Sequence, residues 1–481
     1  MAVDLGSRIV AEERRPYETT SLHPGWAEQD PRDWSEGAAE ALGRLVTRLS
    51  DPDAVLAIGL TGQCPSVAPC DKAGQPVGPG LIYRDNRAAA EAATIRDTIG
   101  LEPLHRRTGH PAEAFHIGPK VLWLRKHEPE VFASTGVFLQ PRDIVLQRLG
   151  RRIATDESHA NATLFFDLRA RCWADDLFAA FELEPALFPE VLSSWEVAAE
   201  LPPDIASETG LRTGIPIVIG AGDSQCVAFG AGVVDPGPIS EMAGSSSCLN
   251  SAVLEPATDV RITHYNHVVP RRYTTEVGLN ATGASIDWAV SRLGYSGYGE
   301  FSDDVETYRA QMIAGHDEDP LSRAPFYLPY LADGERDDPT AQAALVGLSA
   351  RHSRAAIAYA IAEGVALAVR ERVLTLQRAG SPLDDLRVAG GGAQLDVLGS
   401  LKADALECPV LHLDADTAAV GTALLAGAAA GVEQEAQSAI AGIVSRASRF
   451  EPDKEGSAIL RARAERFNEL TSSAALHMEV R

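Results

Sequence analysis

The segment Ile215-Pro216-Ile217-Val218-Ile219-Gly220-Ala221-Gly222-Asp223 decides the fold class of this chain. An apolar run leads into small residues and then into a carboxylate, and continuous apolar runs of this kind fit strands buried on both faces of a largely parallel sheet. The pattern recurs where Val55 to Leu60 leads into Thr61-Gly62-Gln63, and where Leu386 to Ala389 leads into Gly390-Gly391-Gly392. Ala-rich helical stretches fit the crossovers, so the sequence predicts an α/β protein. Ligands of such sheets bind outside the carboxyl ends of the strands, where these loops lie.

Two helices and a domain boundary are predicted further along the chain. The region from Ser353 to Gly380 is apolar at every fourth position and stops at Gly380-Ser381-Pro382, which is typical of a long helix. Thr417 to Ala430 consists almost entirely of Ala, Gly, Leu and Val, which indicates a shorter, buried helix. Gly232 to Pro238 has the composition of a hinge. We therefore expect an N-terminal domain over 1–234 and a C-terminal domain over 235–481, with a cleft that can close on two substrates.

Composition limits the class of protein. The chain has 481 residues, 45% of them hydrophobic and 23% charged, which is typical of a folded protein of two or more domains. Its net charge of −24 disfavours nucleic acid and anionic membranes as partners. The six cysteines lack CxxC spacing, which favours reduced thiols over a metal cluster or a disulfide framework. No long apolar run predicts a membrane span or a signal peptide, so we expect a cytoplasmic protein.

Asp223 is the first candidate for chemistry. It follows a predicted buried strand, and the preceding Gly220-Ala221-Gly222 allows another molecule to approach the backbone closely. A carboxylate in this place can accept a proton from a substrate hydroxyl. The alternative is that Asp223 only caps the helix that follows it, because Asp is preferred at helix starts. Both interpretations stay open at the level of the local sequence.

Two glycine-rich turns are candidates for binding phosphate or a nucleotide. Gly244-Ser245-Ser246 lies between two strand-like pieces, and backbone amides at such a tip can cradle a phosphate, although an ordinary hairpin turn explains it as well. Gly390-Gly391-Gly392-Ala393-Gln394 joins a strand to a helix, and glycines there permit close contact with a nucleotide. The second pattern differs from the dinucleotide-binding GxGxxG fingerprint.

Polar side chains in early loops are candidates for binding a sugar. Gln63 follows the first predicted strand, and Asp85-Asn86-Arg87 could make paired hydrogen bonds to hydroxyl groups. A surface turn with a local ion pair is the alternative. Lys120 and Trp123 are three residues apart, so they share one helix face, where Trp123 is either a core residue or a sugar platform.

In this order, the motifs resemble the FGGY carbohydrate kinases, and most of all their xylulokinase-like members. The resemblance runs from about His23 to Gly427. The matching segments are His23 to Pro31, Thr61-Gly62-Gln63, Asp85-Asn86-Arg87, Lys120 to Leu124, Gly220 to Asp223, Gly244-Ser245-Ser246, Leu328 to Leu331 with Gly334-Glu335-Arg336, and Gly390 to Gln394. The segment Lys120 to Leu124 belongs to the family's first signature motif, from which Ile117 departs because a Pro, Ser or Thr is expected there.

The resemblance implies an actin-like fold of two ribonuclease-H-like domains flanking a cleft, and phosphorylation of a pentulose-like ketose or polyol by ATP with Mg²⁺. It implies Asp223 as the catalytic base, no metal ligand being assigned. The implied substrate-binding residues are Gln63, Cys64, Asp85, Arg87, Trp123 and Asp223. The implied nucleotide-binding residues are Gly244, Ser245, Ser246, Gly283, Gly391, Gly392, Ala393 and Gln394. A homodimer is left open.

Two departures from the family pattern bear on function. Asp4-Leu5-Gly6-Ser7 matches the family's opening phosphate loop only superficially, because Arg8 to Glu12 resembles the strand that follows the first hairpin. We therefore expect the first strand and its loop to be absent, which makes a catalytically impaired sugar-binding protein the alternative function. Cys64-Pro65 stands where xylulokinase-like members carry Met-His, so xylulose itself is doubtful as the sugar.

Overall fold

The structure is a computed structural model that describes residues 1–315, 319–332, 334–335 and 341–478. The chain divides into two compact units. The first unit contains 1–234, 253–275 and 417–442, and the second contains 235–252, 276–416 and 443–481. The first crossing between units falls between Val234 and Asp235, at the predicted hinge, but the chain then returns to the first unit twice. The units are therefore discontinuous in sequence, unlike a single division at 234/235.

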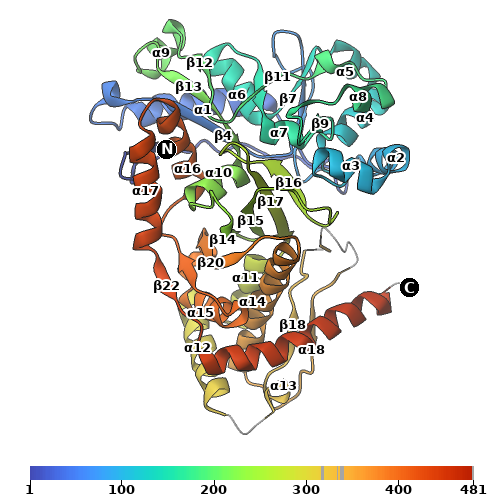
Figure 1. Cartoon of the computed structure of the whole chain (residues 1–481), viewed down its shortest axis with the longest axis vertical. Helices are drawn as coiled ribbons and strands as arrows, with labels where there is room; N and C mark the ends of the chain where they lie inside the picture. The colour runs from blue at the N-terminus through green and yellow to red at the C-terminus, as the bar shows by residue number, and fades with distance from the viewer. Residues whose placement is uncertain (316–318, 333, 336–340, 479–481) are drawn as a thin grey trace. The chain divides into compact units, whose positions relative to one another are not determined.

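The first unit contains both helices and short strands (Figure 1). Its helices are α1 (Pro31–Val46), α2 (Ala89–Ile99), α3 (Leu101–Thr108), α4 (Ile117–His127), α5 (Pro129–Ser134), α6 (Pro141–Gly150), α7 (Glu157–Asn161), α8 (Asp175–Ala180), α9 (Pro203–Thr209), α10 (Asp223–Gly230) and α16 (Thr417–Ala429). Its strands are β1 (Ala2–Val3), β2 (Ile9–Ala11), β3 (Glu28–Gln29), β4 (Ile58–Gly62), β5 (Ala68–Cys70), β6 (Gly80–Leu81), β7 (Val137–Leu139), β8 (Ala154–Asp156), β9 (Phe166–Asp167), β10 (Cys172–Trp173), β11 (Glu190–Leu192), β12 (Val197–Glu200), β13 (Pro216–Gly222) and β16 (Thr263–Asn266).

Strands β4 and β13 are the two apolar runs that the sequence predicts as buried, and they pair in parallel in the order β12-β13-β4. Ala221 lies opposite Thr61 and Gly222 opposite Gly62. Between Val218 and Ala221 the register of β13 is irregular, and there Gly220 adopts φ +68° and a Cβ atom would lie 1.7 Å from the carbonyl oxygen of Leu60. Glycine is required there, because a side chain would meet both a left-handed backbone and a backbone atom. Both predicted strands are confirmed, but β4 begins at Ile58 rather than Val55, and the small residues expected in the two loops belong to the strand ends.

The second unit is built on a larger sheet. Its strands follow one another in the order β17 (Tyr273–Leu279), β15 (Ser247–Val253), β14 (Gly237–Ala243), β20 (Leu383–Ala389), β21 (Val410–His412) and β22 (Ser448–Phe450). A separate hairpin joins β18 (Phe326–Leu328) to β19 (Ala344–Val346). The helices are α11 (Thr282–Arg292), α12 (Tyr298–Ala314), α13 (Pro320–Arg323), α14 (Arg354–Arg378), α15 (Asp396–Leu406) and α18 (Lys454–Met478), while α17 (Glu433–Arg446) passes from the first unit to the second.

Both predicted helices are confirmed. Helix α14 begins after Ser353, whose hydroxyl accepts a hydrogen bond from the backbone N–H of Ala356 at 3.2 Å, as an N-cap does. Helix α16 is the predicted buried Ala-rich helix. Of the hallmark motif at 328–336, Arg336 lies outside the described residues. Within the described ranges, no helix combines the length and the apolar character that crossing a membrane requires.

The N-terminal segment forms a small hairpin, and the absence of the family's first strand and loop stays a prediction. A two-residue strand, β1, pairs antiparallel with β2, and Asp4 lies in the turn between them. The Asp4 carboxylate accepts hydrogen bonds from the backbone N–H groups of Gly6 and Arg8, both at 2.9 Å, and pairs with the Arg8 guanidinium at 2.8 Å. Slight desolvation would raise the pKa of Asp4, but the bonds from Arg8 outweigh it and lower that pKa. The hairpin forms a sheet of its own, separate from β12-β13-β4.

Candidate functional site

The first group of predicted residues lies in the first unit, at the ends of β4 and β13. Gln63 follows Gly62 and Asp223 follows Gly222, and these glycines are opposite each other in a parallel pair. The Thr61 hydroxyl reinforces the pairing by donating to the carbonyl oxygen of Ala221 at 2.9 Å. Since parallel strands end at the same edge of a sheet, Gln63 and Asp223 emerge side by side. We call Gln63, Cys64 and Asp223 the first loop cluster.

Asp223 is the first residue of α10 rather than its N-cap. The N-cap is Gly222, and no side chain caps the helix. The Asp223 carboxylate accepts a hydrogen bond from the backbone N–H of Ser224 at 2.9 Å and is partly exposed. The residue before it is also held: the backbone N–H of Gly222 donates to Ser158 Oγ at 3.0 Å, and Ser158 Oγ donates to Asp156 at 2.7 Å. The start of α10 is thereby tied to the buried start of α7.

A buried charge network supports this strand end. Arg142 and Asp156, both without exposed side-chain surface, pair at 3.0 Å, and Arg142 also pairs with Asp143 at 2.7 Å. Arg142 donates to the carbonyl oxygens of Ile219 at 2.8 Å and Gly220 at 3.2 Å, in the end of β13 that leads to Asp223. Burial would raise the pKa of Asp156, but the Arg142 charge and the bond from His159 hold it well below its usual range. Asp156 is therefore ionised and rigidly held.

Gln63 and Cys64 have neighbours that their local sequence did not predict. Gln63 Nε2 donates to Gln29 Oε1 at 2.8 Å, and Trp34 Nε1 donates to the same oxygen at 2.9 Å. Cys64 Sγ lies 3.6 Å from Gln140 Oε1. A Cβ atom built on Gly222 would lie 3.8 Å from Cys64 Cβ, so the cysteine borders the strand end that carries Asp223.

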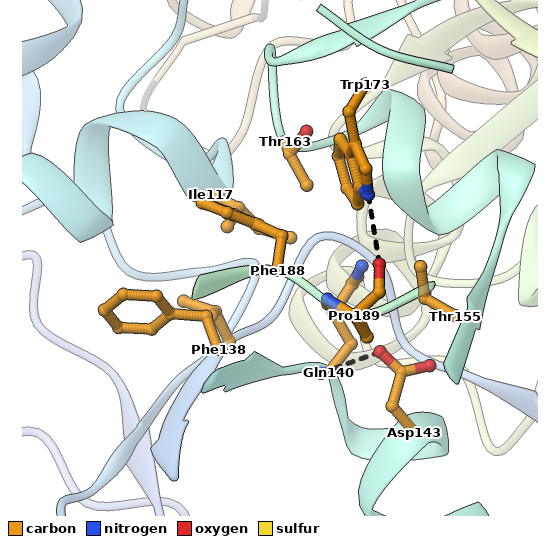
Figure 2. A pocket seen from close by; sticks show the side chains of 10 residues that line it. Ile117, Phe138, Gln140, Asp143, Thr155, Thr163, Trp173, Phe188 and Pro189 are labelled. Atoms are coloured by element: carbon orange, nitrogen blue, oxygen red, sulfur yellow. Dashed lines mark hydrogen bonds between the residues drawn. The ribbon is translucent and has the colours of Figure 1, made fainter. Parts of the chain in front are cut away.

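Gln140 also lines an interior cavity of the first unit (Figure 2). Figure 2 shows the mainly aromatic wall of Phe138, Phe188 and Trp173 facing polar groups that include Asp143. None of Gln63, Cys64 and Asp223 is among the residues that line it. The cavity is thus distinct from the first loop cluster, and Gln140 separates the two.

Asp85 and Arg87 form a compact ionic unit. The Arg87 guanidinium pairs with Asp85 at 2.7 Å and with Glu28 at 2.7 Å, and it lies 3.6 Å from the ring centroid of Trp26. The Asp85 carboxylate also accepts a hydrogen bond from the backbone N–H of Ala27 at 2.7 Å. The Asp85 side chain has no exposed surface and that of Arg87 is 3% exposed. We therefore revise the expected role of Asp85 from a direct contact to the support of Arg87.

Trp123 is part of the hydrophobic core. It is 7% exposed, stacks on His127 with the ring centroids 4.9 Å apart, and meets Trp26 edge to face at 5.4 Å. Its position on α4 satisfies the helix prediction. A sugar platform needs an open ring face, so we revise Trp123 to a residue that supports Trp26 and Arg87.

Lys120, also on α4, bonds to the segments that carry Gln63 and Arg87. Its fully buried ammonium donates to the carbonyl oxygens of Ile82 at 2.8 Å and Pro65 at 3.4 Å. Burial lowers the pKa of Lys120 to about 7, although the nearby Asp85 charge raises it in part. The lysine therefore links the loop of Gln63 to the loop of Arg87.

Stability should depend on pH through Lys120. A folded-state pKa near 7 lies below the usual lysine value of about 10.4, so between these values the unfolded state binds more protons. The stability contributed at this position rises with pH over that window and is constant below it. We expect the Tm of the wild type, relative to Lys120→Met, to increase between pH 7 and pH 10, as measured by thermal unfolding in a pH series.

Lys126→Met is the matched control, because Lys126 lies on the same helix with a 65% exposed side chain. Its Tm difference from the wild type should stay flat over the same series. A flat difference for Lys120→Met as well would contradict the buried, depressed lysine.

The second group of predicted residues lies in the second unit. Gly244-Ser245-Ser246 connects β14 to β15, and Gly390 to Gln394 follows β20, which pairs in parallel with β14. Cβ atoms built on Gly390 and Gly392 would lie 2.8 Å from the carbonyl oxygen and 2.5 Å from the Cβ of Ala243, so the second turn packs against the residue that precedes the first. Gly391 has nothing within 4 Å of its built Cβ and is exposed, which leaves room for another molecule. We call these turns the second loop cluster.

Gly283 belongs to the second loop cluster as well. Its built Cβ would lie 2.1 Å from the carbonyl oxygen of Gly244, so only glycine fits. The next residue, Ala284, donates its backbone N–H to the carbonyl oxygen of Ser245 at 2.9 Å. The start of α11 is therefore fastened to the 244–246 turn.

Sequence reasoning missed the supporting residues of both clusters. Glu28, Gln29, Arg142 and Asp156 in the first unit lie far along the chain from the groups they hold. The sole sequence signal was the family-like loop at His23 to Pro31, which contains Glu28 and Gln29. Among the residues that the structure describes, no group of three or more His, Cys, Asp or Glu side chains is arranged to hold a metal ion.

Each unit is α/β and carries glycines at its strand ends, and the similarity to a solved sugar kinase identifies the actin-like ATPase fold. The chain belongs to the FGGY family of carbohydrate kinases, because the model of the family's N-terminal domain matches residues 1–230 and that of its C-terminal domain matches residues 241–430. It is therefore a sugar kinase with the actin-like fold of two domains.

Relatives match over most of the chain. The chain is 27% identical to the xylulose kinase of Bacillus subtilis, over 94% of this chain and 89% of that protein. It is 28% identical to the xylulose kinase of Escherichia coli K12, over 82% and 80% respectively. The crystal structure of xylulose kinase from Rhodospirillum rubrum superposes with a TM-score of 0.85 at 27% identity, covering 97% of this chain and 94% of that one.

Proposed function

We propose that this kinase transfers the γ-phosphoryl group of ATP to a hydroxyl of a small sugar, a pentulose-like ketose or a polyol. The relatives described as xylulose kinases support a substrate of this size and class. Cys64-Pro65 replaces the Met-His of xylulokinase-like members, so the proposal stops short of xylulose itself. A site that loses a hydrogen-bonding side chain changes its discrimination between similar substrates strongly.

The observation that carries the proposal is the emergence of Gln63 and Asp223 at the ends of adjacent parallel strands. Asp223 accepts the proton of the sugar hydroxyl as that oxygen attacks the γ-phosphorus. The new O–P bond forms while the bond to the β–γ bridging oxygen breaks, and ADP leaves with its electrons. Gln63 and Cys64 contact the sugar, and the buried Arg87, held by Asp85 and Glu28, supports the neighbouring loop rather than touching the ligand.

The second loop cluster binds the nucleotide in this proposal. Gly244, Ser245 and Ser246 hold phosphate through backbone N–H and hydroxyl groups, with Gly283 beneath them. Gly391, Gly392, Ala393 and Gln394 contact the adenosine, where the open space at Gly391 suits close approach. Mg²⁺ enters with ATP as part of the donor substrate and neutralises charge on the phosphates. Turnover requires the sugar hydroxyl and the γ-phosphoryl group of ATP to come together.

A coupled ADP-release screen over pentuloses, hexuloses and polyols tests the proposed function. We expect sugar-dependent ADP release with at least one pentulose or polyol, and ATP hydrolysis without sugar to be slower. Release that is equal with and without every sugar would contradict the proposal.

The alternative is a protein that binds a sugar without phosphorylating it. The motivating observation is that the Asp4 carboxylate is already occupied by Gly6 and Arg8, in a hairpin separate from the main sheet of the first unit. Calorimetric titration of the sugar, run beside the ADP-release assay, distinguishes the two functions. The alternative expects sugar binding in the titration and no sugar-dependent ADP release in the assay.

A further inference from the structure

A buried ion pair links the elements that carry the two turns of the second loop cluster. Lys402 Nζ, on α15, donates to Glu241 Oε2, on β14, at 2.6 Å. The two side chains are 1% and 0% exposed. Glu241 lies shortly before the 244–246 turn, and α15 begins just after the 390–394 turn. The pair thus links the strand that leads into the first turn to the helix that follows the second.

The other oxygen of Glu241 extends the link to the far side of the first turn. Ser247 Oγ donates to Glu241 Oε1 at 2.7 Å and lies 2.8 Å from Thr282 Oγ1. Ser247 begins β15, directly after the turn, and Thr282 begins α11, which is fastened to Ser245 through Ala284. All three chain segments around the 244–246 turn therefore converge on one carboxylate.

His412 is the other titratable group beside this pair. Burial, and then the Lys402 charge, lower the pKa of His412 to about 4, so the imidazole is neutral near pH 7. The Asp396 and Glu241 carboxylates and a hydrogen bond with the backbone of Ala393 oppose this shift only in part. The charge of Lys402 is therefore balanced by Glu241.

A pair of this kind is poor evidence for stability. Removing two charges from water is costly, and replacing both partners by apolar residues of similar size is often neutral or stabilising. The geometric effect is different, because a short, charge-assisted bond with a branched acceptor allows few arrangements. An apolar replacement would fill the space without holding the turns at one spacing.

We propose that Glu241 and Lys402, with Ser247 and Thr282, are positioning residues that set the spacing and orientation of the two nucleotide-binding turns. The inference rests on the proposed function, in which these turns hold ATP. It predicts that the pair affects the use of ATP selectively and leaves the use of the sugar unchanged.

The test is the double variant Glu241→Leu/Lys402→Met beside its two single variants. The single variants should lower the Tm, because each leaves one buried charge unpaired. The double variant should recover most of the Tm but show a KM for ATP raised about tenfold or more, since small misplacements of reacting groups are costly. The KM for the sugar should stay within about twofold, a split that a merely structural role would not produce. A double variant with a recovered Tm and an unchanged KM for ATP overturns the proposal.

A second pair of variants tests the same idea without a change of charge. Thr282→Val removes the hydroxyl that meets Ser247, and Thr282→Ser keeps it. We expect the KM for ATP to rise in Thr282→Val and to stay near the wild-type value in Thr282→Ser. Equal values in both variants count against the proposal even if the double variant fails to fold.

Two controls separate this inference from the proposed nucleotide site. Gly391→Val places a side chain in open space, so it should keep the Tm and raise the KM for ATP if the nucleotide binds there. Glu363→Gln weakens another buried pair of the second unit, Arg463–Glu363, whose hydrogen bonds reach neither turn. The Glu363→Gln variant should lower the Tm and leave the KM for ATP unchanged. An effect of Gly391→Val without one from Glu241→Leu/Lys402→Met refutes the inference, and no effect of Gly391→Val refutes the site.

Discussion

Asp223→Asn is expected to lower kcat for sugar phosphorylation by about 10²–10⁴-fold while the dissociation constant for the sugar stays near the wild-type value. The amide oxygen of Asn can still accept the hydrogen bond from the backbone N–H of Ser224, which is 2.9 Å from the carboxylate. It cannot take a proton at neutral pH. The substitution therefore removes the proposed base and keeps the local geometry. Single-turnover phosphoryl transfer and calorimetric titration of the sugar measure the two quantities.

The same variant separates catalysis from a purely structural role at the start of α10. Asn and Asp are both well tolerated at the start of a helix, so a purely structural Asp223 predicts an active Asp223→Asn enzyme. Asp175→Asn is the matched control, since Asp175 is also the first residue of a helix, α8, and is exposed. It should retain full activity. Full activity in Asp223→Asn would reject the proposed base.

Arg142→Met is expected to cost about 3–5 kcal/mol of unfolding free energy, because it leaves buried carboxylates without their partner. Arg142 pairs with Asp143 and Asp156 where none of the side chains is more than 1% exposed. It also donates to the carbonyl oxygens of Ile219 and Gly220, so the strand end that carries Asp223 should loosen. Urea unfolding followed by tryptophan fluorescence measures the loss, and kcat should fall with it.

Arg148→Met provides the comparison on the same helix, α6. Arg148 pairs with Glu36 and Glu208, which are 67% and 44% exposed. Solvent-exposed pairs contribute about 0–1 kcal/mol, so this variant should unfold near the wild-type urea concentration. Similar losses of unfolding free energy in both variants would contradict the argument that burial makes the Arg142 ion pairs important for stability.

The sequence was sufficient wherever a property depends on neighbouring residues. Continuous apolar runs before Gln63, Asp223 and Gly390 predicted strands β4, β13 and β20, because a strand buried on both faces needs apolar side chains at every position. Ser353 and the apolar spacing after it predicted α14 for equally local reasons. The order of the motifs was enough to indicate the family, which the family models confirm.

The supporting contacts could not be predicted, because they join residues that are distant along the chain. Asp85 resembled an exposed sugar contact, yet tertiary packing buries it against Arg87 and Ala27, and only burial decides whether a carboxylate can meet a ligand. Glu241 and Lys402 are separated by most of the second unit's sequence and meet at 2.6 Å. Local patterns determined which elements form and which turns carry glycine. The tertiary structure alone decided which polar groups lie side by side, because burial and pairing depend on how distant segments pack.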